Sequence, residues 1–442
     1  MRNSARRQLL AALGGAWLPS AAAAPASPLA AGQAAGPPGL LRALSVSGLP
    51  LSSFGVVVQA VNGAPELAAI NADAPYVLAS TAKIVTALAA LDMLGPRWRW
   101  RTHAFVTGPV VAGRLQGDLM IVGGGDARLT SSELRAWMQR MRAQGLHEIG
   151  GDILLDHSAF TLSEADHRHT PVPAANRPRH VWPHALMLDE GVMQVSMKSA
   201  RGLRHVSMVA PPGLDYVAPV VARLWAESGA VLHGQVRDID LTQGNPLRQR
   251  WPSRGEGGEL LMPWSTHLSE PLPLILREMN KSSNNVTARH LMLSMARGFP
   301  LLAASLVGAQ TSVHAWLRRQ GLRDDDITMD NGSGLSRTER GKPRALVQLL
   351  RQAWTSRDAQ SFVDSLPVAG VDGTLERRMQ HGAATGRAFL KTGSLLDARA
   401  LAGYVSGHSG TMYAVAALVN HPHAGRASPA LDGMIEWVAK HG

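Results

Sequence analysis

The stretch that decides the fold is Val77-Leu-Ala-Ser-Thr-Ala-Lys-Ile-Val-Thr-Ala-Leu-Ala-Ala-Leu91, in which Ser80 and Lys83 form the pattern S-x-x-K. Its apolar spacing predicts a helix with one buried face, which Gly95-Pro96 ends. Residues three apart on a helix are neighbours, so the Ser80 hydroxyl and the Lys83 amine lie side by side. Burial favours a neutral amine, which can accept the hydroxyl proton. Ser80 is therefore a candidate nucleophile and Lys83 its candidate base.

S-x-x-K alone is a weak motif, and a helix-capping serine followed by a surface lysine is the alternative interpretation. Two further stretches favour the interpretation of Ser80 as a nucleophile and Lys83 as its base. Ser283-Asn284-Asn285 reads S-x-N on a helix or loop, and Lys391-Thr392-Gly393 reads K-T-G on a predicted strand. In this order the three patterns are the motifs of serine penicillin-binding proteins and β-lactamases.

The composition describes a large chain without cysteine chemistry. The 442 residues are 45% hydrophobic and 17% charged, which suits two or more domains. With no cysteines, disulfides, thiolate metal sites and cysteine nucleophiles are excluded. We expect no cofactor and no metal, because the pairs His167/His169 and His421/His423 have no third ligand at metal spacing.

The N-terminal residues predict export. A basic head and a short apolar stretch lead to small residues at 20–26, the pattern of a cleavable signal peptide over 1–26 and hence of a periplasmic protein. Removing its three arginines lowers the formal net charge from +11 to +8. A basic surface suits a cell-wall polymer or a membrane face. We expect no nucleic-acid partner and no transmembrane helix in the mature chain, and peripheral membrane association stays open.

The pattern of helices and strands predicts an α/β (α+β) domain. Strands at 53–60, 388–395, 400–406 and 411–419 form an antiparallel sheet, with a hairpin at Gly407–Gly410 and a C-terminal helix packed on it. Helices are expected at 274–279, 312–320 and 344–356. Residues 27–98 and 262–442 form this domain, while the short strands of residues 99–261 form a large β-rich insertion between the S-x-x-K and S-x-N motifs.

The chain resembles the D-alanyl-D-alanine carboxypeptidase/endopeptidase family of class C low-molecular-mass penicillin-binding proteins (the penicillin-binding protein 4 type). The resemblance runs from about residue 50 to the end. Its matching segments are Leu78–Lys83, Gly117–Leu119, Gly123–Leu129, Gly151–Asp156, Met279–Asn285, Asp330–Arg337, Leu366–Leu375 and Leu390–Leu395. It implies a serine β-lactamase/transpeptidase-like fold whose extra domains separate Ser80 from Ser283.

The resemblance also implies a role for each motif residue. Ser80 attacks the carbonyl of the penultimate D-Ala of a peptidoglycan stem peptide, and Lys83 acts as general base. Ser283 passes the proton to the leaving amine, and Asn285 holds Lys83 and the substrate. The residues of the predicted strand at 388–395 bind the substrate. Lys391 and Thr392 bind the terminal carboxylate, Gly393 lets the substrate lie along the strand, and Ser394 joins Ser80 in the oxyanion hole.

Two further positions, Asp156 and Arg337, match family positions near the pocket for the stem-peptide side chain, with a purely structural role as the alternative. The chain departs from the family at Asn284, where many relatives have Asp, and at Ser282, where Lys is frequent. The rate and the peptide preference therefore stay open, as do the balance of carboxypeptidase and endopeptidase action, the diamino acid, the export route and the oligomeric state.

The predicted function is a serine D-Ala-D-Ala carboxypeptidase/endopeptidase that β-lactam antibiotics acylate. A serine β-lactamase is the first alternative, against which the large insertion and the family-specific loops argue. The second is a catalytically silent wall-binding scaffold. The intact motif residues argue against it, because a scaffold has no need of them.

Overall fold

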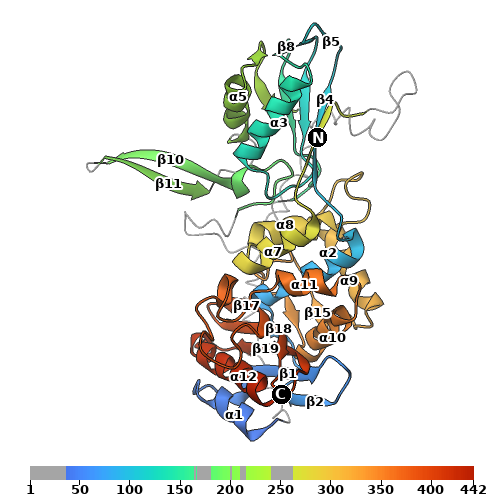
Figure 1. Cartoon of the computed structure of the whole chain (residues 1–442). Helices are drawn as coiled ribbons and strands as arrows, with labels where there is room; N and C mark the ends of the chain where they lie inside the picture. Colours follow the sequence, from blue (N-terminus) through green and yellow to red (C-terminus); the bar gives the residue numbers. More distant parts are fainter. Residues whose placement is uncertain (1–35, 164–165, 167–180, 200–201, 210–215, 240–261) are drawn as a thin grey trace, which may run out of the picture.

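The computed structural model describes residues 36–163, 166, 181–199, 202–209, 216–239 and 262–442. The predicted signal peptide, residues 1–26, lies outside these residues. Figure 1 shows two parts, a lower one from both ends of the described chain and an upper one from the segment between them. No helix within the described ranges is long and apolar enough to cross a membrane.

The lower part is built on a five-stranded antiparallel sheet of order β17-β18-β19-β1-β2. Its strands are β1 (Phe54–Ala60), β2 (Glu66–Ile70), β17 (Ala388–Leu395), β18 (Ala398–Ser406) and β19 (Met412–Asn420). The predicted antiparallel sheet, its hairpin and its N-terminal strand are confirmed.

Alternation along these strands gives the sheet two apolar faces. Val56 and Val58 share a core with α1 (Pro38–Ser45) and α12 (Ala427–His441). Val57 points to the other face and joins a larger core with the remaining helices of this part. Those helices are α2 (Ala82–Leu94), α7 (Leu272–Ser282), α8 (Asn285–Ser294), α9 (Leu306–Arg319), α10 (Pro343–Trp354) and α11 (Ala359–Ser365). The sheet is therefore the middle of three layers.

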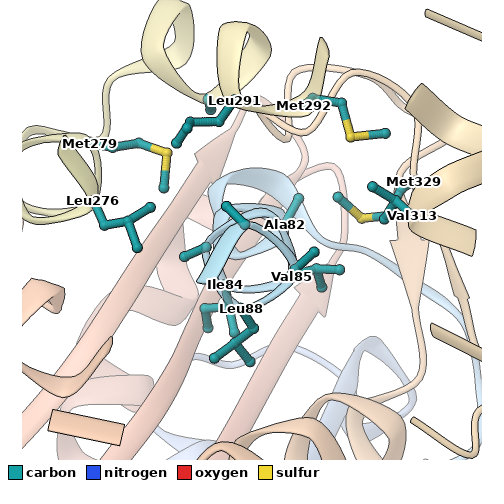
Figure 2. Close-up of a cluster of buried hydrophobic side chains, with 14 of the residues drawn as sticks. Ala82, Ile84, Val85, Leu88, Leu276, Met279, Leu291, Met292, Val313 and Met329 are labelled. Atoms are coloured by element: carbon teal, nitrogen blue, oxygen red, sulfur yellow. The ribbon is translucent and has the colours of Figure 1, made fainter. Parts of the chain in front are cut away.

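Helix α2 is buried on every side, whereas the sequence pattern predicted one buried face. All ten residues from Ala82 to Leu91 are buried. Figure 2 looks along the helix and shows apolar side chains of α7, α8 and α9 gathered around it. The polar residues Lys83 and Thr86 lie within this buried run, which is why the apolar periodicity understated the burial.

The upper part contains two further sheets and a hairpin. One sheet has the order β13-β9-β7-β4-β14, the other β12-β8-β6-β5, and α3 (Ser131–Ala143) and α5 (Val217–Glu227) pack in their core. The strands are β4 (Arg101–Val106), β5 (Val110–Val111), β6 (Arg114–Leu115), β7 (Leu119–Val122), β8 (Glu148–Ile149), β9 (Ile153–Asp156), β12 (Val231–Leu232), β13 (Val236–Asp238) and β14 (Ser265–Leu268). The hairpin pairs β10 (Val192–Ser199) with β11 (Gly202–Val209).

The division of the chain at residues 98 and 261 stays a prediction. Strand pairing places β14, which follows residue 261, beside β4 in the upper sheet. The Ser269 hydroxyl also accepts a hydrogen bond from the Trp100 backbone N–H at 2.9 Å. The two points at which the chain passes between the lower and the upper part therefore lie side by side.

Candidate active site

Ser80 lies in a 3₁₀ turn (Ala79–Thr81) directly before α2, and Lys83 lies in the first turn of α2. The Lys83 Nζ donates a hydrogen bond to the Ser80 Oγ over 3.2 Å. The Lys83 side chain is completely buried, so the alternative of a surface lysine is wrong. The predicted adjacency of hydroxyl and amine is present in the fold.

Two further groups hold the Lys83 amine. Nζ donates to the Asn285 Oδ1 at 2.7 Å and to the Ser333 carbonyl at 2.5 Å. Asn285 is the last residue of the S-x-N motif and the first residue of α8. Ser333 belongs to the loop between β15 (Ile327–Thr328) and β16 (Arg340–Gly341). The amine is thereby held beside Ser80 from two separate segments of the chain.

Ser283 joins the second motif to the third. It ends α7 in a left-handed conformation, with φ of 59°. Its Oγ accepts a hydrogen bond from the Lys391 Nζ at 3.0 Å. Backbone strain of this kind at a non-glycine residue is typical of functional sites. Ala79, which precedes Ser80, has a positive φ of 46° as well.

Lys391 is fully buried on β17 and also donates to the Thr392 carbonyl at 2.9 Å. Burial and, to a lesser extent, the nearby Lys83 hold the pKa of its amine well below the usual value. A low pKa means that protonating Lys391 has a cost that a negatively charged ligand offsets. This environment suits the recognition of a carboxylate.

Strand β17 lies at an edge of its sheet, with Gly393 close to Ser80. A Cβ added at Gly393 would lie 3.0 Å from the backbone N of Ser80 and 3.0 Å from the Ala79 Cβ. Glycine therefore permits the close approach of β17 to the Ser80 turn. Thr392 is held by its Oγ1, which donates to the Thr374 Oγ1 at 2.7 Å, while Ser394 is exposed. An edge strand beside a candidate nucleophile suits an extended peptide.

Arg337 lies near this edge, and its guanidinium pairs with the Asp397 carboxylate in the turn after β17. Its side chain is 46% exposed.

Asp156 lies in a different part of the fold. It is fully buried at the end of β9 and lines a cavity of about 460 Å³ with Met93 and Leu94, at the far end of α2 from Ser80. A 13-residue helix is about 20 Å long, so the structure does not bring Asp156 to the Ser80–Lys83 cluster.

Ser333 and Thr374 lie in segments that match the family, but no contact was predicted for either of them from the sequence, and Glu190 was not identified at all. Glu190, from the turn before β10, explains the unusual Asn284. The Asn284 Nδ2 donates to the Glu190 Oε1 at 2.8 Å, and its Oδ1 caps α8 by accepting the Thr287 N–H at 3.0 Å. Arg128 lies 3.6 Å from the same Glu190 oxygen. An Asp at position 284 keeps the cap but has no donor for Glu190.

We predict that Asn284→Asp lowers the free energy of unfolding at pH 8 by about 1 kcal/mol, because two carboxylates then face each other on a partly exposed surface. Burial raises the pKa of Glu190, so Glu190 gains its proton at a higher pH than an exposed carboxyl does, and the loss shrinks at acidic pH. Thermal unfolding at pH 8 and at acidic pH measures this. The double variant Asn284→Asp/Glu190→Gln restores a donor and should recover the loss. Equal stability of variant and wild type at pH 8 would contradict the prediction.

Two buried lysines, Lys83 and Lys391, each contact a serine hydroxyl, an arrangement that suits acyl transfer by a serine. The chain matches the profile of the D-Ala-D-Ala carboxypeptidase 3 (S13) family over residues 42–221 and 253–441, and it belongs to that family. The predicted family and the predicted class of enzyme are confirmed.

Particular relatives cover most of the chain. The D-alanyl-D-alanine carboxypeptidase DacB of Haemophilus influenzae is 26% identical over 84% of this chain and 85% of its own. The D-alanyl-D-alanine carboxypeptidase of Actinomadura sp. strain R39 is 28% identical over 86% of this chain and 80% of its own. The crystal structure of H. influenzae penicillin-binding protein 4 superposes with a TM-score of 0.71 at 22% identity, over 87% of this chain and 94% of that one. The same protein has been solved in complex with a β-lactam (TM-score 0.68). The predicted fold class is confirmed.

Proposed function

We propose that this chain is a serine D-Ala-D-Ala carboxypeptidase/endopeptidase of peptidoglycan stem peptides, with Ser80 as nucleophile and Lys83 as general base. The observation that carries the proposal is the contact of one fully buried amine, Lys83 Nζ, with both the Ser80 Oγ and the Asn285 Oδ1. A buried amine within hydrogen-bond reach of a hydroxyl meets the geometric requirement for activating that hydroxyl.

The acylation step follows from these contacts. The Ser80 Oγ attacks the carbonyl carbon of the penultimate D-Ala while its proton moves to Lys83. The tetrahedral oxyanion accepts hydrogen bonds from the backbone N–H groups of Ser80 and Ser394. The C–N bond then breaks, and the terminal D-Ala leaves after its amine gains, through Ser283, the proton that Lys83 took from Ser80. The product is an ester between Ser80 and the shortened peptide.

Water completes the cycle: it attacks the ester carbonyl carbon while Lys83 accepts its proton, the C–O bond to Ser80 breaks, and Lys83 returns the proton to the Ser80 Oγ. Lys391 and Thr392 hold the terminal carboxylate during acylation, and the peptide lies along β17 beside Gly393. The exposed Arg337, near the end of that strand, is a candidate contact for the stem-peptide side chain. In a β-lactam the broken amide stays attached to the acyl group. The leaving amine therefore does not depart, and the acyl-enzyme persists.

The periplasm is the proposed location, supported by the signal-like residues 1–26 and by the substrate class, peptidoglycan. N-terminal sequencing of the protein recovered from the periplasm tests this: mature protein that begins near residue 27 is the expected result. Protein recovered only from the cytoplasm with its N-terminus intact contradicts it.

The function is tested by intact-mass analysis after incubation with benzylpenicillin, alongside release of D-Ala from a peptide ending in D-Ala-D-Ala. We expect a long-lived adduct on the wild type and on the control Ser312→Ala, whose hydroxyl bonds only within α9 in the described structure. We expect none on Ser80→Ala. A short-lived adduct with rapid penicillin turnover indicates a β-lactamase instead, and no adduct with no D-Ala release indicates a silent scaffold. An adduct that persists in Ser80→Ala means that Ser80 is not the nucleophile.

A further inference from the structure

A buried carboxylate lies beside the candidate active site. Glu339 directly precedes β16, and its side chain has no exposed surface. It is outside the three motifs, and the acyl-transfer steps above do not use it. A buried carboxylate without strong hydrogen bonds is costly, so its partners indicate its purpose.

The Glu339 carboxylate accepts hydrogen bonds from three backbone N–H groups of one loop. Oε1 accepts from Asp330 at 3.2 Å and from Gly332 at 2.6 Å, and Oε2 accepts from Gly334 at 2.5 Å. The loop therefore wraps around a single side chain. Hydrogen bonds of backbone N–H groups to a carboxylate are among the stronger ones in proteins, so Glu339 largely fixes the path of residues 330–334.

This loop is the one that holds the candidate base. The Ser333 carbonyl, which accepts from the Lys83 Nζ at 2.5 Å, lies between Gly332 and Gly334, whose N–H groups Glu339 fixes. The neighbouring Gly332 carbonyl accepts from the Thr86 Oγ1 of α2 at 2.7 Å. The direction in which the Ser333 carbonyl points, and with it the direction of the Lys83 amine, therefore depends on the Glu339 carboxylate.

The same residue also borders the nucleophile. The Glu339 backbone carbonyl accepts from the Leu78 N–H at 3.0 Å, two residues before Ser80. Strand β16, which follows Glu339, pairs with β3 (Tyr76–Val77). On the loop side, Gly334 packs against the peptide that leads into Ser80: an added Cβ would lie 1.9 Å from the Ala79 O and 2.7 Å from the Ser80 N.

We propose that Glu339 is a positioning residue for acyl transfer, whose carboxylate orients the 330–334 loop so that Lys83 and the Ser80 peptide keep their reactive arrangement. The proposal rests on the proposed function, since it requires Lys83 to be the base for Ser80. Glu339 itself touches neither hydroxyl nor amine and acts through the loop.

The protonation of Glu339 offers an independent readout. Burial, and to a lesser extent Asp330, raises the pKa of the Glu339 carboxyl to about 7, although the loop N–H groups act in the opposite direction. Arg289, also buried, interacts with Glu339 and Asp330, and Lys83 faces the loop through Ser333. A protonated Glu339 accepts the three N–H groups less well. Acylation should therefore slow as pH falls through about 7. This part of the pH dependence of the acylation rate should disappear when Glu339 is replaced.

The test compares the acylation kinetics of Glu339→Gln with those of the wild type. Glutamine has the same shape, but its NH₂ group must face at least one of the three loop N–H groups, which sets donor against donor. We expect the limiting rate of acylation by benzylpenicillin to fall about 100-fold, the cost of misplacing a reacting group by about 1 Å. The apparent dissociation constant of the first complex should change little.

The matched control is Asp126→Asn, which removes another buried carboxylate that accepts a backbone N–H, from Arg128 at 2.9 Å. The pKa of Asp126 is also raised, to about 7, mainly by burial. Asp126→Asn should lower the melting temperature but leave the limiting acylation rate and its pH profile unchanged. A change confined to stability in both variants would mean that Glu339 has only a structural role.

A second variant decides the matter if Glu339→Gln does not fold. Gly334→Ala leaves Glu339 in place but pushes the loop from the Ala79–Ser80 peptide, and it should reproduce the slow acylation. Normal acylation rates in folded Glu339→Gln, or in Gly334→Ala, overturn the positioning role while leaving the proposed function intact. A wild-type protein that forms no adduct overturns both.

Discussion

Lys83→Met is expected to lower the rate of acylation by benzylpenicillin about 10³- to 10⁴-fold without unfolding the protein. Methionine has an unbranched side chain of similar length and suits the apolar surroundings of α2. It cannot accept the Ser80 proton, and a positioned general base typically contributes up to about 10⁴-fold. Intact-mass time courses measure the rate, and circular dichroism checks the fold.

The matched control for Lys83→Met is Lys342→Met. Lys342 is a nearly buried lysine of the same part of the protein, paired with Asp325 and Asp326. Removing it should lower stability, because it leaves Asp326 with one partner fewer, but adduct formation should continue at the wild-type rate. If Lys83→Met acylates within about tenfold of the wild type, another group takes the Ser80 proton and the role given to Lys83 is wrong.

Lys391→Met is expected to reduce the hydrolysis of peptides ending in D-Ala-D-Ala about 100-fold in kcat/KM, and to affect the matching C-terminal amides far less. The reason is the loss of a buried charged hydrogen bond to the terminal carboxylate, worth about 2–5 kcal/mol when one partner is removed. Comparing acid and amide substrates isolates this contact from any general disturbance of β17.

The pH dependence of the same comparison has a definite sign. The pKa of Lys391 is lowered by burial and by Lys83, so in the free enzyme its amine loses its charge as pH rises through that lowered value. The preference for the acid over the amide should therefore decline with rising pH in the wild type and be flat in Lys391→Met. An acid preference that grows with pH would show that Lys391 is not the group that binds the carboxylate.

Sequence reasoning reached the motif contacts because their geometry is local or shared by a family. Ser80 and Lys83 are one helical turn apart, which fixes their adjacency once the helix exists. That Ser283 and Lys391 belong to one site is not local information and followed from the resemblance alone, while their direct contact was not predicted. The strands of the antiparallel sheet were predictable from short apolar runs bounded by turn signals, such as Val56-Val57-Val58, which indicate strands buried on both faces.

The remaining features depend on backbone groups and distant pairings. Every residue has a backbone carbonyl, so nothing in the sequence marked the carbonyl of Ser333 as a partner of Lys83. Glu339 resembles any charged loop residue in the sequence, because burial is decided by the strands packed around it. Asp156 is the last residue of a segment that matches the family, yet the fold places it at the far end of α2. Strand β14 extends the upper sheet past residue 261 through pairing with β4, which no local pattern reveals.

The order of strands in the main sheet determines when the candidate site can form as the chain is synthesised and folds. Val57 of β1 is paired with Ala416 of β19, 359 residues further along the chain. The strand that holds Lys391 and Gly393 also comes from this late segment, and it packs directly on the Ser80 turn. Contacts between such distant segments form slowly and late in folding. A nascent chain thus carries Ser80 and Lys83 before the candidate site is complete. Reactivity towards peptide bonds appears only when the last strands have arrived.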